Sequence, residues 1–279
     1  MISLKDSNTY RLNVHAKNVF YPSSVNELLQ HIERYPEAII LGNGSNIIFS
    51  KEIYIDEHFI IFDHRFATIS HEDNGRVVAQ AGTLLKNISL FALDYMYTGL
   101  EVFYDIPGSV GGALWMNAGA YGSCIYDYIE EVSVLNRETK RIVSYHKSAI
   151  EFSYRSTMFQ NSHDIIISAT FKLSYLDRGL IFNRMQSIFE TRQNKLPFEP
   201  SAGSVFKRPK YHISVGEMVE NLGLKGYKIG GAMISEKHGG IIINRLNAKS
   251  SDIDQLINLI KHAVRYSYGV HLELEQIFL

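Results

Sequence analysis

The feature that most constrains this chain is a long glycine-rich segment, IPGSVGGALWMNAGAYG, between Ile106 and Gly122. Its glycines alternate with apolar residues such as Val110 and Leu114, whereas a plain connector of this length is usually polar. Glycine lets the backbone approach a bound molecule closely, and successive N–H groups in such a segment form concavities that bind anions. The alternative is a set of tight turns within the core. The conformational entropy that so many glycines lose on folding favours ligand binding.

A second glycine-rich loop, GNGSN, covers residues 42–46 and directly follows a predicted buried strand at 38–41. It approaches the Rossmann fingerprint, but Ile47 occupies the third glycine position and no long helix is expected after it. A Gly-Lys-Ser/Thr sequence is also missing, so it is not a nucleotide-binding P-loop. Alone, it fits an ordinary strand-to-loop turn equally well. Together, the two segments predict a site for one pyrophosphate-bearing cofactor.

The remaining pattern predicts an α+β protein of two or three small domains. Ser24 and Glu27 form a capping box for a helix that should end before Pro36. Further helices are expected at 83–97, with Gly99 as the stop, at 180–193, at 214–222, and at 251–266, with Gly269 as the stop. Short strands are expected at 60–62 and 76–79, a strand-rich region at 129–173, and a terminal strand with alternating polarity at 270–275.

Composition excludes several classes of function. The formal net charge is -1, so there is no basic excess for a nucleic acid or an anionic membrane. Cys124 is the single cysteine, which excludes an internal disulfide and suits a reducing compartment. The N-terminus lacks the apolar core of a signal peptide, and no apolar run could span a bilayer. The histidines are scattered without metal-ligand spacing, so no metal site is expected. We therefore expect a cytoplasmic, monomeric protein.

Six motifs in order resemble a known family. They are LGNGSN (41–46), GLEVFYDIPGSVGGALWMNAGAYG (99–122), YRSTMF (154–159), KLPFEPSAGSVFKRP (195–209), GLKGYKIGGAMISEKHGGIIIN (223–244) and LELE (272–275). Together they resemble the UDP-N-acetylenolpyruvoylglucosamine reductase (MurB) family, in the shorter variety that lacks a tyrosine-bearing insertion. Any one motif could mislead, whereas six in the same order are highly specific.

The resemblance implies a fold and a reaction. The fold would be an FAD-binding domain of the vanillyl-alcohol-oxidase (PCMH) type with subdomains at 1–62 and 63–195. A C-terminal α+β substrate domain at 196–279 would follow, with its last strand returning to the active site. The implied cofactor is non-covalent FAD, with NADPH as co-substrate. UDP-N-acetylglucosamine enolpyruvate would be reduced to UDP-N-acetylmuramate, a precursor of peptidoglycan.

The resemblance also implies site residues. Those expected to bind FAD lie in the two glycine-rich segments: Gly42, Asn43, Gly44, Ser45, Asn46, Pro107, Gly108, Ser109, Gly111, Gly112, Asn117, Gly119, Ala120, Tyr121 and Gly122. Aromatic packing would explain Tyr121 equally well. Those expected to bind substrate are Tyr154, Lys195 and Asn244. Lys207 and Arg208 could serve the substrate diphosphate or be solvated surface charges.

Three residues match the family's catalytic positions: Arg155, Ser204 and Glu275. Arg155 can hold the substrate carboxylate through two hydrogen bonds, although a lone arginine is usually a surface ion pair. Glu275 would donate to the developing enolate, which requires a raised pKa. The strand pattern alone does not distinguish it from Glu273. Ser204 would deliver the proton to carbon, although a serine after Gly203 is also typical of a plain turn.

The chain departs from the family pattern at three places. Asn13 and Val14 replace two glycines near the N-terminus, Asn43 replaces a common glycine, and Leu274 replaces a proline. Because Val14 is a stiff residue, the N-terminal change puts FAD affinity in question. Two rival hypotheses remain: a flavin oxidase that uses molecular oxygen, and a catalytically silent protein that binds flavin or a sugar nucleotide.

Overall fold

The computed structural model describes residues 1–279, and the chain divides into two compact units. Unit 1 comprises Met1–Asn18, Gly44–Asp56 and Gln193–Leu279. Unit 2 comprises Val19–Asn43 and Glu57–Arg192. Each unit therefore combines segments that are distant in sequence, and each has hydrophobic clusters of its own.

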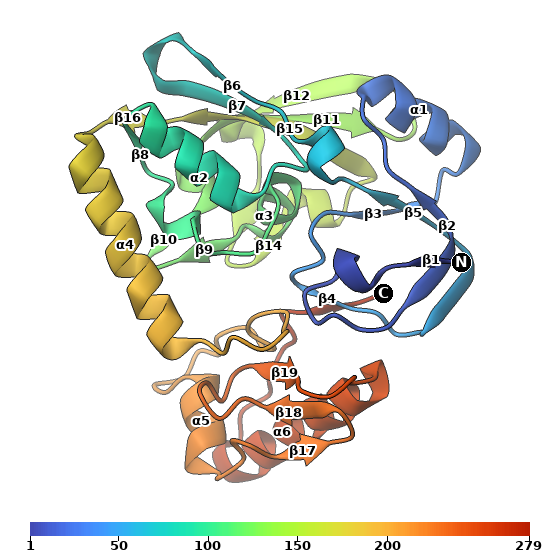
Figure 1. The fold of residues 1–279 in the computed structure, drawn as a ribbon, viewed down its shortest axis with the longest axis vertical. Helices are drawn as coiled ribbons and strands as arrows, with labels where there is room; N and C mark the ends of the chain where they lie inside the picture. Colours follow the sequence, from blue (N-terminus) through green and yellow to red (C-terminus); the bar gives the residue numbers. More distant parts are fainter. The chain divides into compact units, whose positions relative to one another are not determined.

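Unit 2 is built on a five-stranded antiparallel sheet (Figure 1). Its strands, in spatial order, are β12 (Ile142–His146), β11 (Ile129–Asn136), β15 (Asp164–Lys172), β7 (Arg76–Gln80) and β6 (Ile69–Glu72). The central strand β15 contributes Ile165 and Ile167 to one hydrophobic cluster and Ile166, which lies between them, to another. Because side chains alternate across a strand, the sheet separates two cores.

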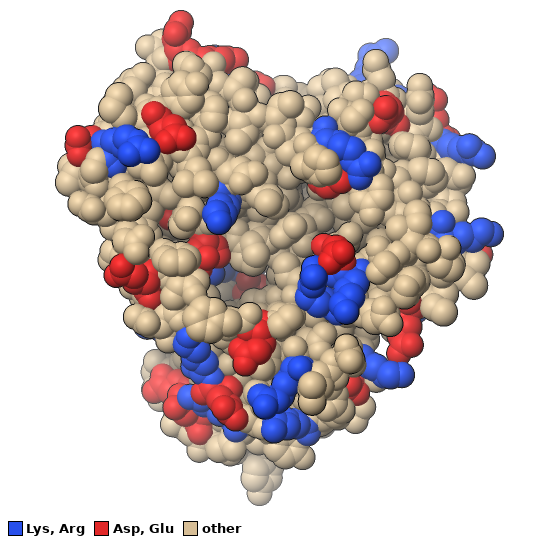
Figure 2. Space-filling model, viewed as in Figure 1, with Lys and Arg blue, Asp and Glu red and all other residues tan.

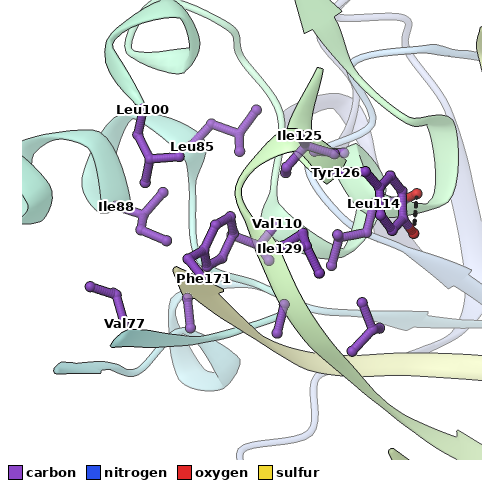
Figure 3. Close-up of a cluster of buried hydrophobic side chains, with 14 of the residues drawn as sticks. Val77, Leu85, Ile88, Leu100, Val110, Leu114, Ile125, Tyr126, Ile129 and Phe171 are labelled. Atoms are coloured by element: carbon purple, nitrogen blue, oxygen red, sulfur yellow. Dashed lines mark hydrogen bonds between the residues drawn. The ribbon is translucent and has the colours of Figure 1, made fainter. Parts of the chain in front are cut away.

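Helices cover the two faces of this sheet. On one face α1 (Val25–Arg34) packs through Leu28 and Ile32, and it begins where the Ser24 side chain accepts a hydrogen bond from the Glu27 N–H. The Ser24 half of the predicted capping box is thereby confirmed, whereas the Glu27 carboxylate accepts from the Ser23 N–H, at 2.7 Å, and not from that of Ser24. On the other face lie α2 (Leu85–Asp94) and α3 (Val110–Met116). Figure 3 shows this second core around Phe171, with the Tyr126 hydroxyl donating to the Leu114 carbonyl at 3.1 Å.

The helix predicted at 83–97 is shorter than expected. α2 ends at Asp94, and Tyr97 and Thr98 form the strand β8 (Tyr97–Thr98) against β16 (Ser174–Tyr175). The helix ends early because Met96 takes a left-handed conformation, with φ of 58°. Gly99, the predicted stop, lies beyond β8 in the next turn.

The other elements of unit 2 are short. β3 (Ile39–Leu41) pairs in parallel with the second half of β5 (Ile53–Ile61). Two small hairpins follow, β9 (Gly119–Ala120) with β10 (Ser123–Cys124) and β13 (Phe152–Ser153) with β14 (Ser156–Thr157). The unit's last helix is α4 (Arg178–Lys195), drawn in gold in Figure 1.

Unit 1 contains an antiparallel sheet of β17 (Lys228–Ile229), β18 (Ala232–Ile234) and β19 (Ile242–Asn244). It also contains α5 (Val215–Asn221) and α6 (Ser250–Tyr268). α6 buries Ile253, Leu256, Ile257, Ile260 and Val264, and it ends as predicted at Gly269, whose φ is 67°. The N-terminal strands β1 (Ile2–Ser3) and β2 (His15–Phe20) pair with each other.

The terminal strand predicted at 270–275 is wrong in position. Residues 270–275 are extended but make a single bridge, between Leu274 and Phe206. The last strand is β20 (Ile277–Phe278), which pairs in parallel with β4 (Ile47–Ile48). The partner of this strand therefore follows the first glycine-rich loop, a pairing that local alternation could not reveal.

Charges of both signs are mixed over the face shown in Figure 2, without a broad area of one sign. This agrees with the nearly balanced composition of the chain. None of the helices has the length and apolar content that a membrane span needs.

Candidate active site

The beginning of the first glycine-rich loop contacts the second within unit 2. The Asn43 Nδ2 donates to the Pro107 carbonyl at 2.8 Å. A Cβ built at Gly42 would lie 2.1 Å from the Ser109 Oγ, so only glycine permits this approach. The absence of a side chain at Gly42 therefore brings residues 42–43 against residues 107–109. These two parts of the expected cofactor site are brought together.

The second segment is not one continuous loop, because α3 lies inside it. Ser109 caps this helix by accepting from the Gly112 N–H at 3.4 Å, and Asn117 ends it in a left-handed conformation with φ of 46°. Packing explains some of the glycines. A Cβ at Gly111 would lie 2.9 Å from the Ala81 Cβ, and one at Gly119 would lie 2.5 Å from the Ser123 carbonyl oxygen.

Other positions of the segment remain open. A Cβ at Gly112 would meet only the Ser109 Oγ, at an ordinary 3.5 Å, and one at Gly122 would meet nothing within 4 Å. Tyr121 is 53% exposed and has a positive φ of 54°. Packing against the core therefore does not account for Tyr121. These open positions, unlike Gly111 and Gly119, leave room for a ligand.

Asn117 has an unused acceptor. Its Nδ2 donates to the Ser153 carbonyl at 2.8 Å, while its Oδ1 is buried and has no hydrogen-bond partner. Such an orphaned polar atom is rare in folded proteins and calls for a partner. FAD carries hydroxyl and ring N–H donors, so the residues of this segment fit the cofactor. The fit rests on a buried acceptor together with open backbone, not on glycine content alone.

Arg155 is held against the same segment. Its guanidinium donates to the Asn117 carbonyl at 3.3 Å and to the Gly119 carbonyl at 3.0 Å. Its backbone φ is 54°, an uncommon conformation for a non-glycine residue. The guanidinium also lies 5.1 Å from the ring centroid of Tyr154. A strained backbone fixed by surrounding contacts is typical of a functional position. The sequence-predicted arginine is therefore anchored on the expected cofactor segment.

The rest of the first loop, Gly44 to Asn46, belongs to unit 1. Gly44 packs on the backbone of residues 7–9, and its carbonyl accepts from the Thr9 N–H at 3.2 Å. The Asn46 Nδ2 donates to the Glu275 carbonyl at 2.9 Å. Only half-exposed Ser45 lies between these two anchored residues.

The altered N-terminal segment folds without strain at the replaced glycines. Arg11 is its left-handed residue, with φ of 57°, whereas Asn13 and Val14 are not. Val14 is 1% exposed, and its carbonyl accepts from the Leu4 N–H at 2.8 Å. The missing glycines therefore do not disturb the local backbone.

Ser204 and Glu275 lie on neighbouring segments of unit 1. The Glu275 N–H donates to the Val205 carbonyl at 2.9 Å, and the Lys207 N–H donates to the Glu273 carbonyl at 3.0 Å. The two glutamates differ in their surroundings. The Glu273 side chain is 78% exposed and pairs with the Lys207 Nζ at 3.6 Å, whereas Glu275 is half-buried. Arg155 belongs to the other unit.

The expected substrate-binding residues have different surroundings. Lys195 is the exposed last residue of α4, and Tyr154 is 53% exposed. Asn244 is buried, and its amide is fully used: Nδ2 donates to the Tyr10 carbonyl and Oδ1 accepts from the Ala248 N–H, both at 2.8 Å. Asn244 therefore supports the backbone of unit 1. No group of side chains in the structure is suited to hold a metal ion.

One residue that the sequence did not single out is central to unit 1. Gln276 is 3% exposed and hydrogen bonds to the turn before Ser204 and to Tyr10. A second polar residue directly after Glu275, followed by the apolar Ile277 and Phe278, was the available signal. No family motif included it.

Comparison with known proteins places these features in a class. Residues 16–144 match the FAD binding domain model, and residues 193–279 match the model of the UDP-N-acetylenolpyruvoylglucosamine reductase C-terminal domain. The fold and site thus define an α+β flavoprotein with an FAD-binding domain of the PCMH type.

Full-length relatives identify the family. The chain is 46% identical, over 99% of its length and 98% of the relative, to the UDP-N-acetylenolpyruvoylglucosamine reductase of Francisella tularensis. It is 41% identical, over 91% of its length and 86% of the relative, to that of Thermosipho melanesiensis. The crystal structure of the enzyme from Thermus caldophilus superposes with a TM-score of 0.85 at 30% identity, covering 100% of this chain and 98% of that one. The chain belongs to the UDP-N-acetylenolpyruvoylglucosamine reductase family, which makes it a flavoprotein oxidoreductase of peptidoglycan precursor synthesis.

Proposed function

We propose that this protein reduces the enolpyruvyl double bond of UDP-N-acetylglucosamine enolpyruvate to give UDP-N-acetylmuramate. FAD, when bound, supplies the hydride, which it takes from NADPH. The observation that carries the proposal is the occurrence of Arg155, Ser204 and Glu275 in a chain 46% identical to a relative over 99% of its length. We further propose that the chain acts as a cytoplasmic monomer with the subdomain boundaries stated above, at 1–62, 63–195 and 196–279.

Arg155 binds and orients the substrate in this proposal. Its guanidinium keeps a permanent charge and offers several donors in one plane, which suits a carboxylate or an enolate oxygen. The bonds to the Asn117 and Gly119 carbonyls occupy part of this donor set and fix the plane of the guanidinium. Attachment to the glycine-rich segment ties the position of Arg155 to that of the cofactor.

Glu275 and Ser204 handle the proton. The half-buried Glu275 is a better candidate for the donor to the enolate than Glu273, whose side chain is exposed and paired with Lys207. A protonated Glu275 would donate to the enolate oxygen. Ser204 would then pass its hydroxyl proton to the carbon, and its placement after the Gly203 turn leaves the hydroxyl exposed in unit 1. A neutral hydroxyl suffices because the carbon acceptor is strongly basic.

The residues proposed to bind substrate come from both units: Lys195 and Asn244 from unit 1, and Tyr154 from unit 2. Lys195 offers a flexible cation for the diphosphate, and Tyr154 offers an exposed ring beside Arg155. Asn244 supports substrate binding indirectly, because its side-chain amide hydrogen bonds to the backbone of Tyr10 and Ala248.

An absorption experiment tests the proposal. Purified protein should show a flavin spectrum that bleaches anaerobically with NADPH and recovers when the enolpyruvyl sugar nucleotide is added. Recovery with molecular oxygen alone, at a rate equal to that with the sugar nucleotide, would favour the oxidase alternative. A flavin spectrum that NADPH does not bleach would favour the silent binding protein.

A substitution separates the two halves of the reaction. Ser204→Ala should be bleached by NADPH at the wild-type rate, yet recover slowly with the sugar nucleotide, because only the second half needs the serine proton. Ser201→Ala, three positions earlier in the same segment, is the matched control. Near-normal turnover of Ser204→Ala would remove the serine from the mechanism. For Glu275, pH–rate profiles of the wild type and Glu275→Gln that coincide would remove the glutamate.

A further inference from the structure

The side-chain amide of Gln276 is buried close to Ser204, the proposed proton donor, and makes three hydrogen bonds. Its Nε2 donates to the Ala202 carbonyl at 3.0 Å and to the Gly203 carbonyl at 3.1 Å. Its Oε1 accepts from the Tyr10 hydroxyl at 3.0 Å. The side chain is 3% exposed, so water does not replace these bonds. Loss of the amide would leave the carbonyl of the buried Ala202 without this donor and release the carbonyl of the exposed Gly203.

The two carbonyls belong to the residues that directly precede Ser204. Gly203 has a φ of 70°, and a Cβ built there would meet nothing within 4 Å. The turn is therefore not braced by packing around Gly203. Its fixed contacts are the Gln276 amide and, on the other side of Ser204, two backbone bonds of Val205: its carbonyl accepts from the Glu275 N–H, and its N–H donates to the Gly240 carbonyl.

Gln276 also follows Glu275 directly in the chain. The Glu275 carbonyl accepts from the Asn46 Nδ2 at 2.9 Å, and the Ile277 N–H donates to the Asn46 carbonyl at 3.0 Å. The backbone on both sides of Gln276 is therefore held by one residue of the first glycine-rich loop. The amide consequently links this fixed segment to the turn that carries the serine.

Tyr10 determines how the amide is oriented. An amide nitrogen with two carbonyl acceptors requires a donor for its oxygen, and the phenol hydroxyl is that donor. Tyr10 is fully buried, and burial raises the pKa of its hydroxyl above the ordinary value, so the hydroxyl keeps its proton. A reversed amide would bring its oxygen toward two carbonyl oxygens. The two carbonyls therefore exclude the reversed orientation, and the Tyr10 hydroxyl stabilises the observed one by donating to the amide oxygen.

We propose that Gln276, oriented by Tyr10, is a positioning residue that fixes the Ser204 hydroxyl relative to the Glu275 carboxyl. This inference rests on the proposed function, in which Ser204 gives the proton. Gln276 touches neither substrate nor cofactor in this role. Its contribution lies in the half-reaction that consumes the serine proton, and reduction of the flavin by NADPH does not depend on it.

The test uses the holoenzyme and compares half-reactions in a stopped-flow instrument. Gln276→Leu should leave flavin reduction by NADPH and the KM for the sugar nucleotide within about twofold of wild type. Reoxidation by the sugar nucleotide should slow by about tenfold to a hundredfold, the cost of misplacing a reacting group by roughly 1 Å. Tyr10→Phe should slow the same step less, since the amide keeps its two donors.

Two further variants keep the test informative if Gln276→Leu does not fold. Gln276→Glu can donate to a carbonyl only when protonated, so its reoxidation rate should rise as the pH falls, unlike that of wild type. Tyr54→Phe is the matched control for Tyr10→Phe, because Tyr54 is equally buried in unit 1 and donates to the Leu279 carbonyl at 2.7 Å. It should reoxidise at the wild-type rate.

The outcomes separate this inference from the proposed function. If Ser204→Ala turns over normally, the serine is removed from the proposed mechanism, whatever Gln276 does. If Ser204→Ala is slow but Gln276→Leu and Gln276→Glu reoxidise like wild type, only the positioning role is overturned. Equal slowing of both half-reactions, or loss of FAD, would also overturn it, because it would indicate general structural damage. Gln276→Leu should add little in a Ser204→Ala background, since both then affect one step.

Discussion

Gly42→Ala tests the steric argument for the cofactor site. The φ of Gly42 does not require glycine, so the backbone itself tolerates alanine. The added Cβ, however, would lie 2.1 Å from the Ser109 Oγ and 3.3 Å from the Ser109 Cβ. Either Ser109 leaves its position at the start of α3, or residues 42–43 move away from residues 107–109.

The magnitude follows from these two responses. Displacing the Ser109 hydroxyl removes the helix cap, which costs about 1 kcal/mol. Overpacking a well-packed position costs about 1–3 kcal/mol more. The free energy of unfolding should therefore fall by about 2–4 kcal/mol. Moving residues 42–43 also strains the hydrogen bond from Asn43 to the Pro107 carbonyl. If this costs about 1.4 kcal/mol of binding free energy, the Kd for FAD rises about tenfold.

The assay is urea unfolding of the FAD-free protein, followed by FAD titration. Ser109→Gly removes both clashing atoms, and glycine at this cap costs only about a few tenths of a kcal/mol. The double variant Gly42→Ala/Ser109→Gly should therefore recover most of the lost stability. Gly112→Ala is the matched control, because its Cβ would be 3.5 Å from the Ser109 Oγ inside α3. It should not destabilise the FAD-free protein, and helix propensity favours it by about 0.5–1 kcal/mol.

Two results would refute the reasoning. The first is Gly42→Ala with a free energy of unfolding equal to that of wild type. The second is a double variant no more stable than the sum of the two single effects predicts, because a steric conflict between two residues must appear as coupling. Weaker FAD binding by Gly112→Ala with unchanged stability would, by contrast, place the ligand at its open side.

Three further predictions concern other parts of the structure. Phe171→Ala, at the centre of the core in Figure 3, should lower the free energy of unfolding in urea by about 3–5 kcal/mol, and a loss below about 1 kcal/mol would contradict its central place. Arg155→Lys keeps the charge but cannot reproduce the two bonds to the Asn117 and Gly119 carbonyls, so kcat/KM should fall at least about tenfold in steady-state assays, a loss of about 1.4 kcal/mol; unchanged kcat/KM would show that these bonds do not matter. Burial lowers the pKa of His238, and its Nδ1 accepts from the Gly240 N–H at 3.1 Å. The folded protein therefore binds this proton less tightly than the unfolded chain. Stability should be complete above about pH 6.5 and decrease as the pH falls from there toward the lowered pKa, and thermal unfolding of His238→Gln should lack this component.

Features set by neighbours in sequence were predictable. The start of the helix at Val25–Arg34 follows from its N-cap Ser24, and Gly269 ends α6 where expected, because both depend on residues a few positions apart. The end of α2 was not predictable. Gly99 is the more usual residue to end a helix, whereas the residue that takes the left-handed conformation is Met96. α3 was not predicted either. Its N-cap Ser109 is a common one, but Gly111 and Gly112 in its first turn made a helix unexpected.

The candidate site likewise combines features that local sequence predicted with features that depend on tertiary packing. The Arg155 motif is local, but its bonds to the Asn117 and Gly119 carbonyls, and the buried Asn117 Oδ1, depend on tertiary packing. The alternation before Glu275 suggested a strand, yet only the bridge from Leu274 to Phe206 formed. Gln276 has no periodic signal, because its importance comes from Tyr10, at the other end of the chain.

The parallel pair β4·β20 has a consequence for biosynthesis. Asn46 and Glu275, which adjoin this pair, are 229 residues apart, so the ribosome must release nearly the whole polypeptide before these partners can meet. Contacts of such long range close slowly, because the entropy of a large loop is lost before any bond forms. Until then β4 lacks its partner strand, which exposes its edge to chaperones and to aggregation. Maturation of the nascent enzyme should thus be limited by the synthesis of β20, long after that of β4.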